Sequence, residues 1–205
     1  MNQQLSNDPQ EFGLHPGELR LIAVGPEWAQ RFAQERSRLC AALGPRALDI
    51  QHIGSTAIPG LPAKPILDMA VAISDFEAGY VLVPLLLPLG YRYLGENGIP
   101  RRHYFVRGTP EAYHLHIFEQ RSRDWQRHLH FRDRLLHSRE LAQRYAQLKE
   151  TAVGQCGGNR ERYQQMKSSF IAEVQAPGAD GATPALHSTS GAHSATDRAS
   201  SARPE

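Results

Sequence analysis

The sequence predicts an α+β domain in which a mixed β-sheet is layered against helices and a helical segment follows the sheet. Residues 66–73 are almost entirely apolar, as expected for a strand that is buried on both faces. Residues 27–43 and 122–174 instead carry apolar residues at helical spacing. The order of one helix, then strands, then further helices is typical of a sheet covered by helices.

One domain over residues 19–175 is expected, between a flexible N-terminal segment (1–18) and a disordered C-terminal tail (176–205). A hydrophobic fraction of 40% in 205 residues is enough for one sizeable core. The tail consists mainly of Ala, Ser, Gly, Thr and Pro, and Leu186 is its only large aliphatic residue. Such a segment cannot bury enough apolar surface to offset its conformational entropy.

The first half of the domain combines one helix with two strands. An apolar stripe predicts a helix over residues 27–43, which a Gly-Pro pair ends. A short strand is expected over residues 47–53 and a loop rich in Gly and Pro over 54–65. The central strand (66–73) follows this loop.

After the central strand, the pattern predicts a short helix and three more strands. The helix is expected over residues 75–87, with Asp75 as its N-cap. Pro84 makes this helix irregular or kinked, because proline has no backbone N–H. The strand candidates, of which the last two form a hairpin, are residues 91–94, 104–107 and 113–118.

The rest of the domain is predicted to form three helices. Ser122 and Asn159 are suited to cap the first and the third, since their side chains accept hydrogen bonds from free backbone N–H groups. Apolar residues at helical spacing define the second helix around residues 141–152. Gly157 and Gly158 separate it from the third.

The composition argues against several classes of protein. The net charge is only +2, so nucleic acid is not expected as a partner. No apolar run approaches the roughly 20 residues needed to cross a bilayer, and the N-terminus lacks an apolar signal core, so we expect a cytoplasmic protein without membrane partners. Cys40 and Cys156 match no metal or redox spacing and are expected to be reduced thiols.

The Gly-rich segment after the first strand is a candidate phosphate-binding loop. A strand that runs into Gly54 and Ser55 presents backbone N–H groups, and glycine lets a ligand approach closely. The hydroxyls of Ser55 and Thr56 would add donors. The alternative is a tight loop whose glycines only serve turn geometry, because a single Gly-Ser pair is a weak signal.

Asp68 interrupts the apolar central strand and is a candidate catalytic or metal-binding carboxylate. Buried carboxylates usually have a partner or a metal. Alternation along the strand places Ile66, Asp68 and Ala70 on one face. In the alternative, structural role, Asp68 caps a helix or pairs with Lys64.

His114 and His116 share one face of the predicted strand 113–118. Two imidazoles in this arrangement can reach one metal ion or one phosphate. The alternative is a pair of surface histidines. The two histidines would form a site with Asp68 if their strands are neighbours in the sheet.

Residues 101–139 are rich in arginine and histidine. Guanidinium groups match the geometry of phosphate, so Arg101, Arg102 and Arg132 are candidate phosphate contacts. Arg127 and Arg134 are expected to lie on a solvated helix face.

As a whole, the chain resembles the GrpB family. The resemblance extends over roughly residues 21–174 and rests on seven ordered blocks: HIGSTAIPGLPAKPILD (52–68), GYRYLGENGIP (90–100), RHYF (102–105), HLH (114–116), FRD (131–133), YxxLK (145–149) and YxxxKxxFI (163–171). It implies a nucleotidyltransferase-like fold, in which helices flank a mixed sheet that bears a Gly-Ser turn and an acidic strand. It also implies relatives that are fused behind dephospho-CoA kinase.

The resemblance also implies a difference from active nucleotidyltransferases. Those enzymes carry carboxylates at i and i+2 on the strand after Gly-Ser, and a third acid on a later strand, to hold Mg²⁺. Here Asp68 fills the first position and Ala70 the second, while His114 and His116 stand where the later acid is expected. One carboxylate is a poor cage for two hard cations. The sequence therefore does not decide between a catalytic and a non-catalytic protein. The cofactor expected for a catalytic form is Mg²⁺ or another divalent metal.

These features predict a divergent nucleotidyltransferase-like protein that binds a nucleotide or phosphorylated small molecule, with metal-dependent nucleotidyl transfer as its catalytic form. Asp68 and His116 are the predicted catalytic and metal-binding residues. The predicted substrate or phosphate contacts are Gly54, Ser55, Thr56, Lys64, Arg101, Arg102, His114, Arg132 and Lys167. The alternative is a non-catalytic binding or folding-assistance module of the kind fused to dephospho-CoA kinase.

Overall fold

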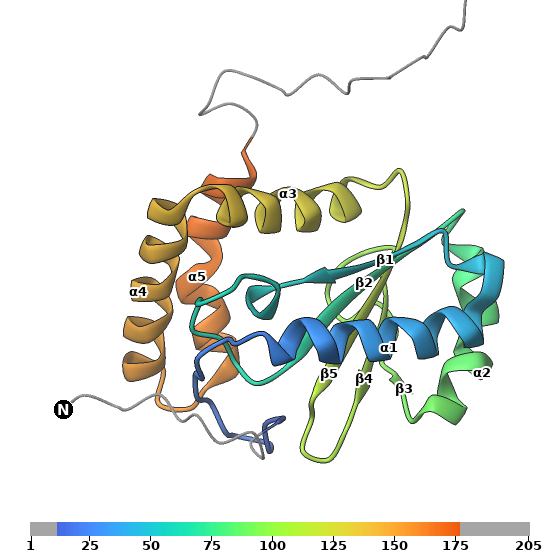
Figure 1. The fold of residues 1–205 in the computed structure, drawn as a ribbon, viewed down its shortest axis with the longest axis horizontal. Helices are drawn as coiled ribbons and strands as arrows, with labels where there is room; N and C mark the ends of the chain where they lie inside the picture. The colour runs from blue at the N-terminus through green and yellow to red at the C-terminus, as the bar shows by residue number, and fades with distance from the viewer. Residues whose placement is uncertain (1–11, 177–205) are drawn as a thin grey trace, which may run out of the picture.

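The structure is a computed structural model that describes residues 12–176, built around one five-stranded sheet (Figure 1). The strand order is β1-β2-β5-β4-β3. β2 and β5 run parallel and the other neighbouring pairs are antiparallel, so the prediction of a mixed sheet is confirmed. The strands are β1 (Asp49–Ile53), β2 (Leu67–Ile73), β3 (Arg92–Tyr93), β4 (His103–Arg107) and β5 (Tyr113–Glu119).

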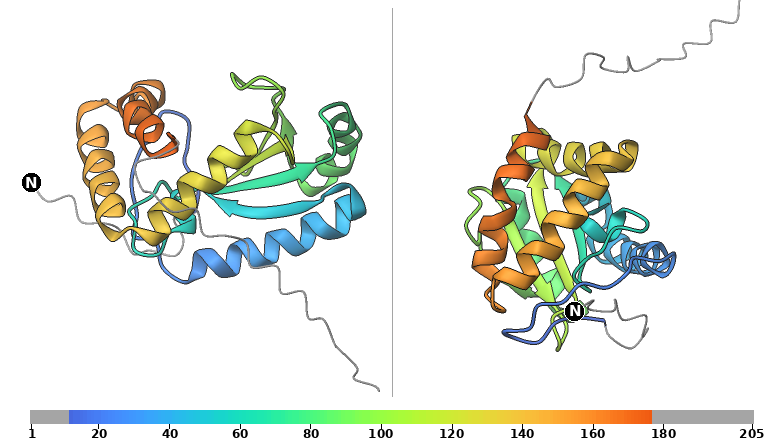
Figure 2. Two further views of the ribbon diagram at one scale, coloured as in Figure 1. Left: turned by 90° about the horizontal axis from the view of Figure 1, so that it is seen from above. Right: turned by 90° about the vertical axis from the view of Figure 1, so that its left-hand side faces the viewer.

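Helices cover both faces of the sheet, as the predicted α+β class requires (Figures 1 and 2). α1 lies along one face, α3 packs on the other, and α4 and α5 lie side by side beyond the ends of the strands. The helices are α1 (Glu27–Leu43), α2 (Val83–Leu86), α3 (Arg123–His137), α4 (Arg139–Gln155) and α5 (Arg160–Gln175). Within the part of the chain that is described, none of the helices is both long enough and apolar enough to cross a membrane.

Side-chain caps fix the starts of the last three helices. Ser122 accepts a hydrogen bond from the backbone N–H of Trp125 at 3.2 Å, and Asn159 accepts one from Arg162 at 2.9 Å. Both caps were predicted from the sequence, and Ser138 caps α4 in the same way. Each cap satisfies one of the N–H groups that the first turn of a helix leaves unpaired.

The helix expected over residues 75–87 forms as three short pieces. A 3₁₀ turn (Glu77–Leu82) leads into α2, and a second 3₁₀ turn (Leu87–Leu89) follows. Pro84 lies in α2 and Pro88 in the second turn. Because proline lacks the N–H that a continuous α-helix needs, the predicted irregularity is confirmed.

Alternation along the strands gives the sheet one apolar face and one face with a polar centre. On the α1 side, the apolar core contains Trp28, Leu39, Leu43, Met69, Val71, Leu115 and Ile117. The other face carries a smaller apolar cluster around Trp125 of α3. Asp68, His114 and His116 have the same parity as this second cluster. The candidate site therefore lies on the side of the sheet away from α1.

The C-terminal helices hold the long loop between β1 and β2. Ile58 and Leu61 of this loop pack among apolar side chains of α3, α4 and α5. Lys149 of α4 also donates a hydrogen bond to the carbonyl of Pro62. The loop that carries Gly54 is thus fixed between the sheet and the helical layer.

Residues 12–18, part of the segment predicted to be flexible, pack against the domain. The backbone N–H of Gly13 donates to the carbonyl of Pro65 at 2.8 Å. Leu14 is fully buried and forms an isolated β-bridge with Glu111. The packed domain therefore extends further toward the N-terminus than the sequence predicts. Apart from its first residue, the predicted tail lies outside the described part of the chain, as does the start of the N-terminal segment.

A buried carboxylate connects α1 to the β4–β3 edge of the sheet. Glu35 accepts hydrogen bonds from the hydroxyl of Tyr91 at 3.0 Å and from Nη2 of Arg107 at 2.8 Å. Arg38, one turn along α1, donates to the same carboxylate at 2.9 Å. The negative charge of Glu35 is therefore balanced by two arginines and is not available to a ligand.

Glu35→Ala should lower the free energy of unfolding by about 3–5 kcal/mol, because it leaves the guanidinium of Arg107 buried without its carboxylate. Arg38→Ala is the matched control. The side chain of Arg38 is 47% exposed, so its loss should change stability by less than about 1 kcal/mol. Urea unfolding measures both variants, and equal losses would contradict this account of the cluster.

Candidate functional site

Gly54 brings the loop after β1 directly onto Asp68. Its φ is 69°, a left-handed conformation that favours glycine. A Cβ at this position would lie 2.7 Å from Oδ2 of Asp68, so a larger residue would displace the carboxylate. Ser55 and Thr56 follow, but the hydroxyl of Thr56 lies 3.0 Å from Nε2 of His52 and helps to hold the loop.

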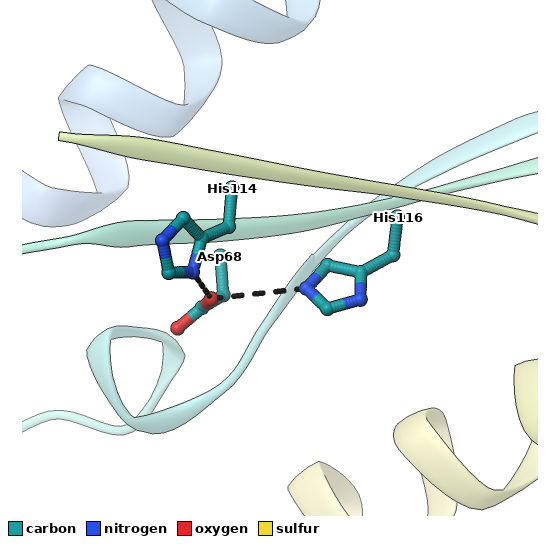
Figure 3. Close-up of side chains that lie close together, drawn as sticks. All are labelled: Asp68, His114 and His116. Atoms are coloured by element: carbon teal, nitrogen blue, oxygen red, sulfur yellow. Dashed lines mark hydrogen bonds and ion pairs between the residues drawn. The ribbon is translucent and has the colours of Figure 1, made fainter. Parts of the chain in front are cut away.

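The parallel pairing of β2 with β5 brings the predicted acid and histidines together (Figure 3). Asp68 stands opposite His114 in the register, and Ala70 stands opposite His116. Oδ1 of Asp68 lies 3.0 Å from Nδ1 of His114 and 3.9 Å from Nε2 of His116. The two strands are neighbours, which the predicted grouping requires.

His114 is held between two carboxylates. Its Nδ1 faces Asp68, and its Nε2 lies 3.0 Å from Oε1 of Glu111. Burial favours the neutral ring, but the two carboxylates outweigh it and raise the pKa of His114. Arg160 donates a hydrogen bond to Glu111 at 3.2 Å and fixes this second carboxylate in turn. The orientation of the His114 ring is therefore fully determined.

His116 has a cationic partner instead. Nη1 of Arg102 lies 3.1 Å from Nδ1 of His116, and arginine can only donate, so Nδ1 accepts. The proton of the neutral ring is then on Nε2, which faces Asp68. Burial lowers the pKa of His116 to about 3, so the ring is neutral at ordinary pH.

A cavity of about 430 Å³ opens over this face of the sheet. Its walls come from the loop after β1, the loop between β3 and β4, and helices α3, α4 and α5. Asp68 is the only carboxylate in this lining. Burial opposes the ionisation of Asp68, but the hydrogen bond from His114, the nearby N–H of His116 and the charge of Lys64 hold its pKa well below the usual range.

Three cations line the cavity: Lys64, Arg102 and Lys167. Arg102 is 5% exposed and Lys167 is 6% exposed. Among residues 12–176, none of the three forms an ion pair with a carboxylate. Burial, followed by the charge of Lys64, lowers the pKa of Lys167 to about 7. Buried cations without partners are unfavourable, and an anionic ligand would stabilise them.

Lysine is rare in this chain. Of the 23 Lys and Arg residues, only Lys64, Lys149 and Lys167 are lysines. In α4 and α5 a tyrosine precedes the lysine by four residues, and the ammonium lies 4.7 Å from the ring centroid of Tyr145 and 4.1 Å from that of Tyr163. Both tyrosines line the cavity and were not predicted. The repeated Tyr-x-x-x-Lys spacing is the sequence signal that could have found them.

Tyr104 and His128 also line the cavity without having been predicted. Tyr104 pairs with His116 across β4 and β5, so alternation along β4 places it on this face once the pairing is known. The ring centroid of His128 on α3 lies 5.6 Å from that of His116. No local sequence signal separates His128 from the exposed residues of the same helix.

Two arginines that were predicted to contact phosphate do not reach the cavity lining. Arg101 forms a two-pronged contact with the carboxylate of Glu119, at 2.9 and 2.8 Å. Arg132 donates to the side chain of Gln51 at 2.7 Å and to the carbonyl of His52 at 3.0 Å. Both guanidinium groups thus donate hydrogen bonds to partners within the fold. Of the three predicted arginines, Arg102 is the one that lines the cavity.

Asp68, His114 and His116 could hold a metal ion, since one ligand atom from each lies within 4.8 Å of the others. One carboxylate and two imidazoles suit a single ion such as Zn²⁺ better than Mg²⁺. Glu111 would be the usual acceptor for the second nitrogen of a metal-bound His114. The second nitrogen of His116 faces Arg102, so its Nε2 offers no lone pair to a metal while this contact holds.

The position at which a second carboxylate would stand is closed. Ala70 is 0% exposed and packs with Ile53, Phe118 and Trp125. The residues present therefore do not fit the pair of Mg²⁺ ions that active nucleotidyltransferases use.

Fold and site together define an α+β domain with a cation-lined cavity on one face of a mixed sheet. The family model described as "GrpB protein" matches residues 18–176. The chain belongs to the GrpB family.

Known relatives support this assignment. UPF0157 protein YqkA of Bacillus subtilis is 37% identical over 162 residues, which cover 78% of this chain and 47% of that protein, so the chain spans about half of its length. The crystal structure of conserved protein GrpB from Enterococcus faecalis matches with a TM-score of 0.71 and 31% identity, over 76% of this chain and 94% of that chain. Dephospho-CoA kinase of Mycolicibacterium paratuberculosis is 40% identical over 76 residues, which are 36% of this chain and 19% of that protein.

Ala70→Asp should destabilise the protein by about 3 kcal/mol or more, because the new carboxylate would lie in an apolar cluster close to Asp68. Added Mg²⁺ should not restore the loss, which thermal melts with and without Mg²⁺ measure. Ala70→Asn is the matched control, since it has nearly the same shape without the charge. Recovery of Ala70→Asp by Mg²⁺ would show instead that the cavity reaches residue 70.

Arg102→Met should strengthen the binding of Zn²⁺ about tenfold or more, because it frees Nδ1 of His116 to carry the proton and leaves Nε2 as a ligand. Isothermal calorimetry with Zn²⁺ alone measures the change. Adding Asp68→Asn to either protein should weaken the binding. Equal Zn²⁺ affinity in the wild type and in Arg102→Met would contradict the role given to Arg102.

Proposed function

We propose that this protein binds a nucleotide or another phosphorylated small molecule in the cavity over Asp68. The observation that carries the proposal is the set of buried or half-buried cations, Lys64, Arg102 and Lys167, in a lining with one carboxylate. Desolvated cations that lack partners lower the stability of the free protein, and an anion among them would offset this loss.

The phosphate would lie between Lys64 and Lys167, next to the turn at Gly54 and Ser55. Lysine is a common phosphate ligand, because its ammonium is a compact point charge with three donors. Arg102 would add charge from a fixed position, since its Nε and Nη2 already donate to the carbonyls of residues 96 and 97.

The organic part of the ligand would contact the apolar side of the cavity. Ile53, Ile99, Phe131 and Ile171 belong to this side. A volume of about 430 Å³ with apolar walls and a few polar groups is typical of small-molecule sites.

Nucleotidyl transfer with one divalent metal ion is the catalytic form of this proposal. Asp68, His114 and His116 would hold the ion, which would polarise a phosphoryl oxygen. Asp68 and His116 would then flank the reacting group. The closeness of the three ligand atoms favours this form, and the contact between Arg102 and His116 opposes it.

A non-catalytic binding or folding-assistance module is the second candidate. The closed position at Ala70 favours it, because the second carboxylate of active nucleotidyltransferases has no place there. The match to a dephospho-CoA kinase also favours this candidate, because the matching segment there is part of a protein named for a kinase that acts on a phosphorylated compound. A test of turnover with bound ligand separates the two candidates.

Lys167→Met should stabilise the ligand-free protein at pH 7, by about 1–4 kcal/mol, because it removes a buried ammonium. The gain should shrink as the pH rises from 7 toward 10. Over this range Lys167 is mostly neutral in the folded protein and still charged in the unfolded chain, so the wild type itself gains stability with pH. Urea unfolding at several pH values measures both effects.

The same variant should lose most of its stabilisation by pyrophosphate, AMP and ATP in thermal-shift experiments. At a concentration a hundred times the Kd, a ligand should stabilise the wild type by about 2.7 kcal/mol. Arg36→Met is the matched control, since it removes one exposed charge from α1, on the other side of the sheet. The proposal is wrong if none of the three probes stabilises the wild type, or if Lys167→Met responds as Arg36→Met does.

A further inference from the structure

The cations of the cavity fall into two groups with different surroundings. Arg102 is bound to His116 and to the carbonyls of residues 96 and 97, so three of its nitrogens are engaged. Lys64 and Lys167 have no such partners among the described residues, and each is affected by the charge of Asp68. The two ammonium groups are therefore the donors that are available to a ligand.

The charge of these two groups matches one phosphate. Oδ1 of Asp68 lies 3.0 Å from His114, and among the described residues no ion pair joins Asp68 to either lysine. When both are protonated, Lys64 and Lys167 present two positive charges that no carboxylate among the described residues contacts. A bound phosphate favours this state, because a nearby anion raises the pKa of an ammonium group. A phosphate monoester carries about −1.5 to −2 at pH 7, enough to balance both. A triphosphate carries more charge than the two ammonium groups can balance.

Proteins usually bind triphosphates together with Mg²⁺, which bridges the phosphates and is held by one or two carboxylates. This cavity offers at most one carboxylate, and that one is already engaged. Asp68 is the single carboxylate of the lining, and its Oδ1 is already in contact with His114. Ala70 closes the place of a second carboxylate.

The remaining lining suits an organic group with apolar faces and polar edges. Phe131, Ile53 and Ile171 supply apolar surface. Asn97 and Gln164 also line the cavity, and their amides can both donate and accept hydrogen bonds. A nucleoside has faces and edges of this kind.

We propose that the cavity takes a phosphate monoester, represented by a nucleoside monophosphate, without a metal ion and with its phosphate between Lys64 and Lys167. The inference rests on the proposed function and narrows it, because it excludes a metal-bound triphosphate as the preferred ligand. It also accounts for lysine rather than arginine at positions 64 and 167. An ammonium group is more compact than a guanidinium group, so two of them fit around a single phosphate.

Isothermal calorimetry on the full chain tests this inference with AMP, CMP, ATP and CTP, each in EDTA and in Mg²⁺. At least one monophosphate should bind ten times more tightly than its triphosphate, with the same affinity in EDTA and in Mg²⁺. Lys64→Met and Lys167→Met should each weaken its binding at least tenfold, and Arg36→Met should leave it unchanged. Melting curves establish that the variants are folded, and Lys64→Gln replaces Lys64→Met if the latter unfolds.

The outcomes separate the inference from the proposed function. Tighter binding of a triphosphate in Mg²⁺ than of its monophosphate would overturn the inference and leave the proposed function in place. If a monophosphate binds and Lys167→Met weakens its binding but the Lys64 variant does not, the inference is overturned and the proposed function remains. If none of the four nucleotides binds and pyrophosphate does not bind, both are overturned.

Discussion

The parallel pairing of β2 with β5 is the constraint on which the candidate site depends. Neighbouring parallel strands keep their alternation in step, so Asp68, His114 and His116 emerge on one face. A register shift of one residue would turn Asp68 into the apolar core under α1. The other parts of the site are arranged around this pairing. The loop after β1 passes over Asp68 because Gly54 has no side chain, and the C-terminal helices fix this loop from the other side.

The domain uses buried charge in two different ways. On one side of the sheet, Glu35 receives hydrogen bonds from Tyr91 and Arg107, so the charge is balanced and links α1 to the strands. On the other side, Arg102 and Lys167 are nearly as buried but lack a carboxylate partner among the described residues. Charge that is satisfied within the fold stabilises it, whereas unsatisfied charge in a cavity is typical of a site that is completed by a ligand.

Much of the fold could be predicted from the sequence, because its signals are local. Apolar periodicity gave the limits of α1, and Ser122 and Asn159 cap their helices as expected. Parity along the strands also placed Asp68 and the two histidines correctly. Alternation along a strand shows which face a side chain is on, but not how deeply it is buried there. The apolar packing around Ala70 therefore could not be predicted from the sequence. Nor could the partner of Arg101, since Glu119 is far from it in the sequence and becomes its neighbour only in the folded chain.

The distribution of lysine has a consequence for the chemical reactivity of the protein. Because the chain has only three lysines, the side-chain primary amines are confined to three positions in or near the interior. Lys149 is 1% exposed and bound to a carbonyl, so among the lysines an acylating reagent reaches mainly Lys64 and Lys167. A bound anion would cover both of these amines. The rate at which such a reagent modifies these two lysines would therefore report how often the cavity is filled.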